Sequence, residues 1–156
     1  MVFTGGAATT IPATTYYDLK IQPGTNSVTH TLGAGTTIVE RDVTFGNGTN
    51  TGIVIAGNTN NTTLSVTRNL TIATSTTFQA NASNELALGG NWTNNGTFTH
   101  NSNTVNLNGT SLQTLLGTMT GSSAFSTIRV TNNSGSDAQS DPSVSFAASA
   151  SVSTST

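Results

Sequence analysis

Residues 62–110 read TTLSVTRNLTIATSTTFQANASNELALGGNWTNNGTFTHNSNTVNLNGT. Short apolar pairs recur at alternate positions in this stretch, and Thr, Ser, Asn and Gly separate each pair from the next. The pairs are Leu64/Val66, Leu70/Ile72, Leu86/Leu88 and Val105/Leu107. Alternation with a period of two indicates β-strands, and runs this short are typical of strands rather than helices. The stretch therefore predicts a series of short strands joined by turns.

The same phrases return along the chain. Arg68-Asn69-Leu70-Thr71 is matched by Gly90-Asn91-Trp92-Thr93 and, earlier, by Arg41-Asp42-Val43-Thr44. Thr77-Phe78 likewise matches Thr97-Phe98, and residues 86–88 match residues 105–107. Equivalent positions lie about 19 to 27 residues apart, which is the length of one coil of a β-solenoid. We therefore predict an all-β, parallel β-solenoid (β-helix) over residues 1–133, followed over residues 134–156 by a loop and a weakly apolar terminal strand.

The composition favours a thin core. Hydrophobic residues make up 33% of the 156 residues and charged residues 6%, against roughly 45–50% and about 25% in an ordinary globular domain. A solenoid needs only one narrow column of inward side chains, so this supply is sufficient. Disorder is the competing interpretation of a chain rich in Gly, Ser, Thr and Asn, but disordered segments lack regular alternation of β-branched residues and usually carry charge.

Charge and cysteine content exclude several classes of function. The net charge is −2, and the only basic residues besides histidine are Lys20, Arg41, Arg68 and Arg129. These cannot form a basic patch, so nucleic acid is not an expected partner. The chain has no cysteine, which excludes disulfides and thiolate metal sites. No apolar run approaches the roughly 18 residues of a membrane span. Met1 leads directly into the strand-like Val2-Phe3, which favours a piece of a longer protein.

The first residues echo a later segment. Phe3-Thr4-Gly5 resembles Leu107-Asn108-Gly109, and residues 17–21 resemble residues 127–130. This similarity predicts that the chain begins and ends in the same phase of a longer period, as a piece of a tandem array would. Chance matching in a biased composition is the alternative.

Polar residues mark the turns between the predicted strands. Asp42, Asn69 and Asn91 occupy equivalent turn positions in the three matching phrases, where such side chains bond to backbone at a bend. Stacked coils would align them as a polar ladder.

Strict alternation from Thr37 to Phe45 would bury Arg41, so we expect a bend between Val39 and Val43.

Residues for catalysis are few and scattered. Glu40 and Asp42 share a strand face, but they lie beside Arg41, and a solvated charge cluster explains them equally well. His30 and His100 fall in different coils without a carboxylate next to them in sequence. No phosphate-binding loop or hydrolase nucleophile motif is present. We therefore predict that the chain is not an enzyme and needs no cofactor.

The tail offers two further candidates. Val144, Phe146, Ala148, Ala150 and Val152 alternate with Ser and Ala and form a possible assembly strand, which could close the end of the stack, pair with another copy or fray. Asp137 and Asp141 lie in a Ser/Gly loop, where carboxylate oxygens could bind Ca²⁺. Two carboxylates four residues apart form neither an EF-hand nor an RTX nonapeptide.

Exposed rows suggest other ligands. The pairs Thr29/Thr31, Thr74/Thr76 and Thr97/Thr99 raise the possibility of ice binding, but the varying coil lengths predict that they are out of register. Tyr16, Tyr17 and Trp92 could contact glycans, although core positions explain such residues more simply.

Three segments carry a resemblance to known proteins. GNWTNNGTF at residues 90–98, VNLNGT and LQTLLG within residues 105–117, and FSTIRVTN at residues 125–132 resemble repeat segments of very large bacterial secreted and cell-surface proteins. The resemblance implies a non-catalytic β-solenoid stalk or adhesin body outside the cell. It also implies, as partners, copies of the chain, adjacent repeats of a longer chain, glycans or a cell surface.

Overall fold

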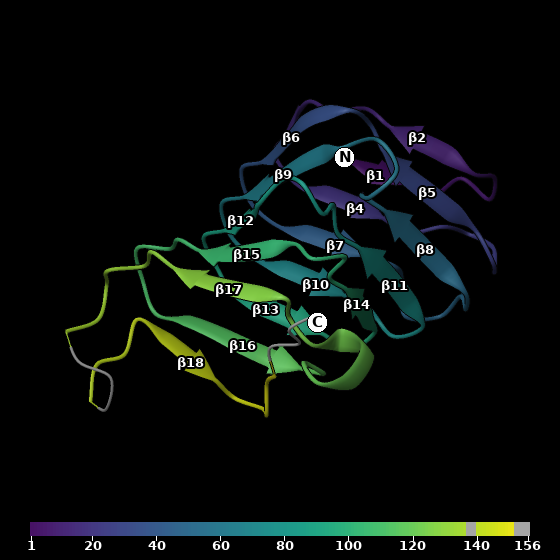
Figure 1. The fold of residues 1–156 in the computed structure, drawn as a ribbon. Helices are drawn as coiled ribbons and strands as arrows, with labels where there is room; N and C mark the ends of the chain where they lie inside the picture. Colours follow the sequence, from purple (N-terminus) through teal and green to yellow (C-terminus); the bar gives the residue numbers. More distant parts are fainter. Residues whose placement is uncertain (137–139, 152–156) are drawn as a thin grey trace.

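The computed structural model describes residues 1–136 and 140–151. The chain is all-β and forms a parallel β-solenoid with three sheets, which we name sheets A, B and C (Figure 1). Sheet A contains β1 (Val2–Phe3), β4 (Leu19–Ile21), β7 (Val43–Phe45), β10 (Leu70–Ile72), β13 (Trp92–Asn94), β16 (Gln113–Gly117) and β18 (Val144–Phe146). Sheet B contains β2 (Thr9–Ile11), β5 (Thr29–Leu32), β8 (Ile53–Ala56), β11 (Thr76–Gln79) and β14 (Thr97–Thr99). Sheet C contains β3 (Thr15–Tyr16), β6 (Gly35–Val39), β9 (Thr62–Val66), β12 (Leu86–Leu88), β15 (Thr104–Leu107) and β17 (Thr127–Val130).

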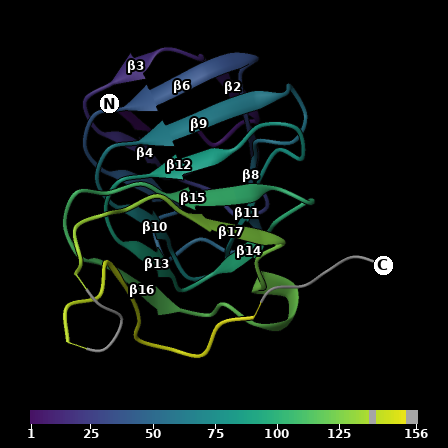
Figure 2. The same cartoon turned by 60° about the vertical axis from the view of Figure 1, so that its left-hand side comes forward.

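Each of the first five coils contributes one strand to each sheet in turn. The first coil is β1 to β3 and the fifth is β13 to β15. Figure 2 shows the strands of sheet C lying one below another from β3 to β17. The predicted parallel β-solenoid is therefore confirmed.

The register follows the repeated phrases. Leu70 pairs with Val43 on one side and with Trp92 on the other, as the three matching phrases predict. Thr77 and Phe78 pair with Thr97 and Phe98, and residues 86–88 pair with residues 105–107. Because side chains alternate between the faces of a strand, this register keeps each apolar pair on the inner side of its sheet.

Differences in coil length are absorbed at the corners. Most paired residues lie within the predicted range, but Val2 pairs with Lys20, 18 residues later, and Gln113 pairs with Val144, 31 residues later. The expected bend is present, because β6 ends at Val39 and β7 begins at Val43. Glycine is required where a corner is tight: Gly117 has φ +91°, and a Cβ there would lie 2.0 Å from the carbonyl oxygen of Asn94.

The core is a narrow apolar column. Inward residues such as Leu70, Ile72 and Leu88 have no exposed surface. Aromatic rings fill the half of the column nearer the C-terminus. The ring centroids of Phe45 and Phe78 are 4.7 Å apart, and those of Trp92 and Phe98, which meet edge-on, are 4.9 Å apart. Each large apolar side chain buried in this way stabilises the fold by about 1.5–3 kcal/mol.

The predicted phase of the first residues is wrong. Phe3 lies in sheet A and its supposed counterpart Leu107 lies in sheet C. Phe3 is in register with Ile21 instead. The echo therefore reflects shared composition, because Thr/Gly turns flanked by Ile or Leu suit every corner of this stack.

The two ends of the stack differ. At the N-terminal end, β1, β2 and β3 are the outermost strands of the three sheets. At the C-terminal end, β18 and β17 are outermost in sheets A and C, while the 3₁₀ helix η1 (Gly121–Ser123) lies against β14 of sheet B. The Ser123 hydroxyl accepts a hydrogen bond from the N–H of Phe98 at 3.0 Å, so η1 covers the edge of sheet B.

Candidate functional site

The three predicted turn residues form one column at the corner between sheets C and A. The Asp42 carboxylate accepts hydrogen bonds from the backbone N–H of Asn69 at 3.1 Å and from its side-chain amide at 2.8 Å. Asn69 Oδ1 accepts from the N–H of Asn91 at 2.9 Å, and Asn91 Oδ1 accepts from the N–H of Thr114 at 2.8 Å. Asp18 begins the column one coil earlier, since its Oδ1 accepts from the N–H of Asp42 at 3.2 Å. The column satisfies backbone N–H groups that the corner leaves out of the sheets.

Charged side chains lie beside this column. Arg41 lies over the ring of Tyr17, with 5.0 Å between its guanidinium carbon and the ring centroid, and 3.8 Å from a carboxylate oxygen of Asp18. The Nε atom of Arg68 lies 3.9 Å from Oδ1 of Asp42. Hydrogen bonding to Tyr17 and the charge of Asp18 raise the pKa of Arg41. Because both arginines face acidic neighbours in an exposed setting, the corner has little net attraction for an anion.

The candidate catalytic groups are not brought together. Glu40 is exposed, whereas the Asp42 carboxylate is held by Asn69. Glu85 instead pairs with Arg129 at 2.5 Å and accepts from the Asn106 amide at 2.9 Å. Within residues 1–136 and 140–151, no group of three or more His, Asp or Glu side chains could hold a metal ion.

The two histidines have structural surroundings. His30 is 1% exposed and lies in the core of sheet B, where it is in register with Thr9 and Ile55. Neither of its ring nitrogens has a hydrogen-bond partner among the described residues. His100 Nδ1 accepts a hydrogen bond from the N–H of Ser102 at 2.9 Å, which supports a tight turn.

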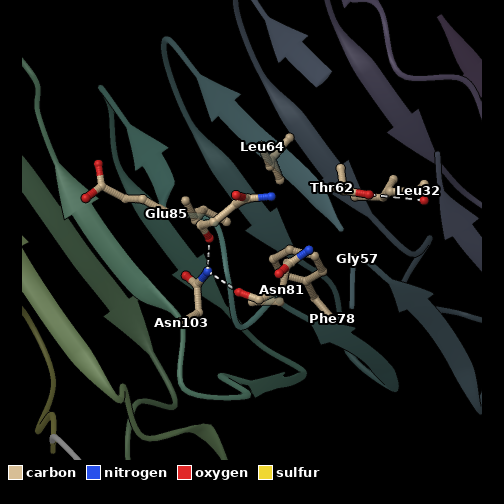
Figure 3. A pocket seen from close by; sticks show the side chains of 11 residues that line it. Leu32, Gly57, Thr62, Leu64, Phe78, Asn81, Glu85 and Asn103 are labelled. Carbon is tan, nitrogen blue, oxygen red and sulfur yellow. Dashed lines mark hydrogen bonds between the residues drawn. The ribbon is translucent and has the colours of Figure 1, made fainter. Parts of the chain in front are cut away.

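Asparagines at the corner between sheets B and C form a second polar column that the sequence analysis missed. The Asn84 side chain donates to the carbonyl oxygen of Asn61 at 2.9 Å, and the Asn103 side chain donates to the carbonyl oxygens of Asn81 and Asn84 at 2.5 Å (Figure 3). Asn61, Asn84 and Asn103 recur at the coil spacing, each shortly before a strand of sheet C. This recurrence is the sequence pattern from which the second column could have been predicted.

A small cavity lies behind this corner. Leu32, Phe78, Asn81 and Asn103 are among the residues that line it (Figure 3). The room for the centre of a water molecule is about 10 Å³, which suffices for roughly one water. The cavity is therefore too small for a sugar or any larger ligand.

Two buried amides fasten the last coil, and no sequence repeat marks them. Gln113 Nε2 donates to the carbonyl oxygens of Leu88 and Gly90 at 2.9 and 2.7 Å. The Asn132 side chain donates to Ser111 O at 2.8 Å, Gln113 Oε1 at 3.0 Å and Ser143 O at 3.1 Å. These bonds join the end of sheet C to the tail.

The tail residues extend the stack. Val144 and Phe146 lie in β18, which pairs with β16 of the same chain, and Ala150 forms a bridge with Met119. Val144 and Ala148 pack against the core. Val152 lies outside the described residues.

The predicted calcium pair is only half described. Asp137 lies outside the described residues. The Asp141 carboxylate accepts hydrogen bonds from the backbone N–H and the hydroxyl of Ser136 at 3.2 and 3.0 Å. Asp141 therefore acts within its own loop.

The expectation that the threonine pairs are out of register is wrong for two of them. Thr29 and Thr97 lie in the same outward column of sheet B, because corner loops absorb the length differences. The third pair is misassigned, since Thr76 is 1% exposed and faces inward.

The three aromatic candidates differ in exposure. Trp92 and Tyr16 are buried, whereas Tyr17 is 62% exposed. Burial also raises the pKa of the Tyr16 hydroxyl, which donates a hydrogen bond to Pro12 O at 2.7 Å. Tyr17 is therefore the one of the three placed to meet a ligand.

No family model, curated protein or solved structure matches the chain. Among the described residues, no helix is long and apolar enough to cross a membrane. The fold class is thus defined by the geometry of the chain itself, as a three-sheet parallel β-solenoid.

Proposed function

We propose that this chain is a non-catalytic structural or adhesive module of an extracellular or cell-surface protein. Its open sheet edges would pair with further coils, either copies of itself or adjacent repeats of a longer chain. The resemblance of residues 86–132 to bacterial surface repeats supports the location. The scattered carboxylates favour a structural role over an enzymatic one.

The observation that carries the proposal is the chemistry of the end strands. β1, β2, β3 and β18 have the sequences VF, TTI, TY and VSF. None of these four contains a charged residue or a proline, the devices with which proteins usually block strand addition. The remaining end strand, β17, has the sequence TIRV, and its one charged residue, Arg129, is paired with Glu85. At the C-terminal end, Ile128, Phe146 and Ala150 also line an apolar groove of about 320 Å³. An added coil would cover these groups and continue sheets A and C.

Sedimentation velocity over a concentration series tests this proposal, with negative-stain images of the same samples. The wild-type chain should grow into larger, regular species as its concentration rises. Phe146→Lys should remain monomeric because a charge at the open edge opposes pairing. Leu116→Lys is the matched control, since Leu116 is 42% exposed and Phe146 is 44% exposed, but Leu116 lies on the outer face of an internal strand. A strictly monomeric wild type, or equal behaviour of the two variants, would count against self-assembly.

A glycan-binding module is the second candidate function, and the exposed ring of Tyr17 favours it. A glycan array should then give hits that Tyr17→Ala abolishes. An array without hits, together with concentration-dependent assembly, would favour the structural role. Turnover of a polysaccharide that disappears in Glu40→Gln would instead favour an enzyme.

A further inference from the structure

The outer face of sheet B differs from the other two faces in carrying no charge. The described charged residues lie in sheets A and C, at the corners beside them, or in the tail. They are Asp18, Lys20, Glu40, Arg41, Asp42, Arg68, Glu85, Arg129 and Asp141. None lies in a strand of sheet B, which runs down the right-hand side of Figure 1.

The same face also lacks large apolar side chains. Among the described residues, the exposed large hydrophobic side chains are Met1, Val2, Tyr17, Ile38, Leu112, Leu116, Val130 and Phe146. All of them lie outside the strands of sheet B. A protein partner needs apolar or charged anchors, and a bound sugar ring commonly stacks on an aromatic side chain. Sheet B offers neither on its outer side.

What the face does offer is two columns made mostly of hydroxyl and methyl groups, interrupted at Gln79 and at Ala56, which is 4% exposed. One outward column runs Thr29, Val54, Thr77, Thr97, and the next runs Thr10, Thr31, Ala56, Gln79, Thr99. Six of these nine positions are threonine. Neighbours within a column are about 4.7–4.9 Å apart, and the two columns are about 6.6 Å apart along a strand.

The array is held rigidly. The intervening inward residues Ile55, Phe78 and Phe98 are at most 1% exposed, and each strand between β2 and β14 is hydrogen-bonded on both sides. Side chains on a buried, doubly paired strand keep their spacing, so water above the face meets a fixed lattice of donors, acceptors and methyl groups.

We propose that the outer face of sheet B binds ice, through an ordered layer of water held by its threonine columns. The inference goes beyond the structural role and does not depend on assembly, because a single copy presents the whole face. Ice is an uncharged, flat and periodic surface of hydrogen-bonding groups, and it makes no use of the charges or apolar anchors that this face lacks.

Partition into a growing ice hemisphere and inhibition of ice recrystallisation test the proposal on the purified chain. The wild type should enter the ice and keep crystals small. Thr77→Arg, in the middle of the face, should lose both effects. Thr71→Arg is the matched control, because Thr71 is equally half-buried and lies in the same coil, but faces outward from sheet A. This variant should behave as the wild type does.

Folding is checked by circular dichroism and melting, and Thr97→Arg in the next strand replaces Thr77→Arg if the latter unfolds. Exclusion of the wild type from ice would overturn the proposal whatever the variants do. Equal loss in the variants of sheets A and B would also overturn it. Binding to an insoluble glycan without any effect on ice would assign the face to a carbohydrate instead.

Discussion

His30 lies in the core with both ring nitrogens unpaired among the described residues. A buried polar group without a partner costs stability, whereas an apolar group of similar size fills the same space. His30→Leu should therefore raise the free energy of unfolding by about 1–2 kcal/mol, measured by urea denaturation. The control is His100→Leu, which removes an acceptor from a turn and should not stabilise. A loss of stability in His30→Leu would show that the imidazole has a partner in solution.

The Asp/Asn column makes a second prediction at this scale. Asn91 Oδ1 accepts a hydrogen bond from the N–H of Thr114, and its removal leaves that corner donor unpaired. Asn91→Ala should lower the free energy of unfolding by about 1 kcal/mol. Asn91→Asp keeps the acceptor and should lose much less, so equal losses in chemical denaturation would contradict the assigned role.

The sequence predicts some of these residues and not others, for a physical reason. Asp42, Asn69 and Asn91 recur in matching phrases because each coil repeats the same corner. Asn94, Gln113 and Asn132 are also buried, but each acts at one place where the stack changes shape. A residue that serves a single irregularity leaves no period in the sequence.

Strands were predictable where the repeat is regular. The pairs from Leu64/Val66 to Val105/Leu107 lie in β9, β10, β12 and β15, with the inward faces expected. The assignment of strands to sheets failed for residues 1–21, because phrases such as Phe3-Thr4-Gly5 do not distinguish one corner from another. Backbone pairing between neighbouring coils decides the sheet, and it depends on the lengths of all intervening loops.

The attachment of β18 gives a prediction at the scale of elements. The Asn132 side chain donates to three oxygen acceptors, including Ser143 O just before β18. Asn132→Ala should lower stability by about 1–3 kcal/mol, and Asn132→Asp should lower it further because a carboxylate would face those oxygens. Melting temperature gives the order of the variants.

Hydrogen exchange locates the effect of this change. The N–H of Gln113 donates to Ser143 O at 3.0 Å, so it should exchange faster in both Asn132 variants. Amides of β4 and β7, far from the tail, serve as the internal control. Unchanged protection at Gln113 would mean that Asn132 does not hold β18 in place.

At the scale of the whole molecule, each coil pairs with the next in the same way, so the stack could continue beyond either end. All strands run parallel, so the edge of β18 at one end matches the edge of β1 at the other, and joining them would be head-to-tail. Such a contact does not close on itself and leads to filaments. The repeat predicted the stack, and the alternation from Val144 predicted a terminal strand where β18 lies. The 3₁₀ helix η1 was not predicted, because it takes the place of a strand of sheet B and does not follow the period.

Disulfide trapping between two single-cysteine variants tests the proposed joining of ends most directly, because the chain contains no other cysteine. Val2 begins the outward column of sheet A that continues through Lys20, Thr44, Thr71, Thr93 and Leu116. Ala147 follows Phe146, the partner of Leu115, so it lies opposite Leu116 and ends the same column. Adjacent strands bring paired Cα atoms within the range of a disulfide. A mixture of Val2→Cys and Ala147→Cys chains should form a mixed dimer under mild oxidation, in preference to either homodimer. If no mixed dimer forms, or if each variant alone cross-links equally well, the chain does not assemble head-to-tail through sheet A.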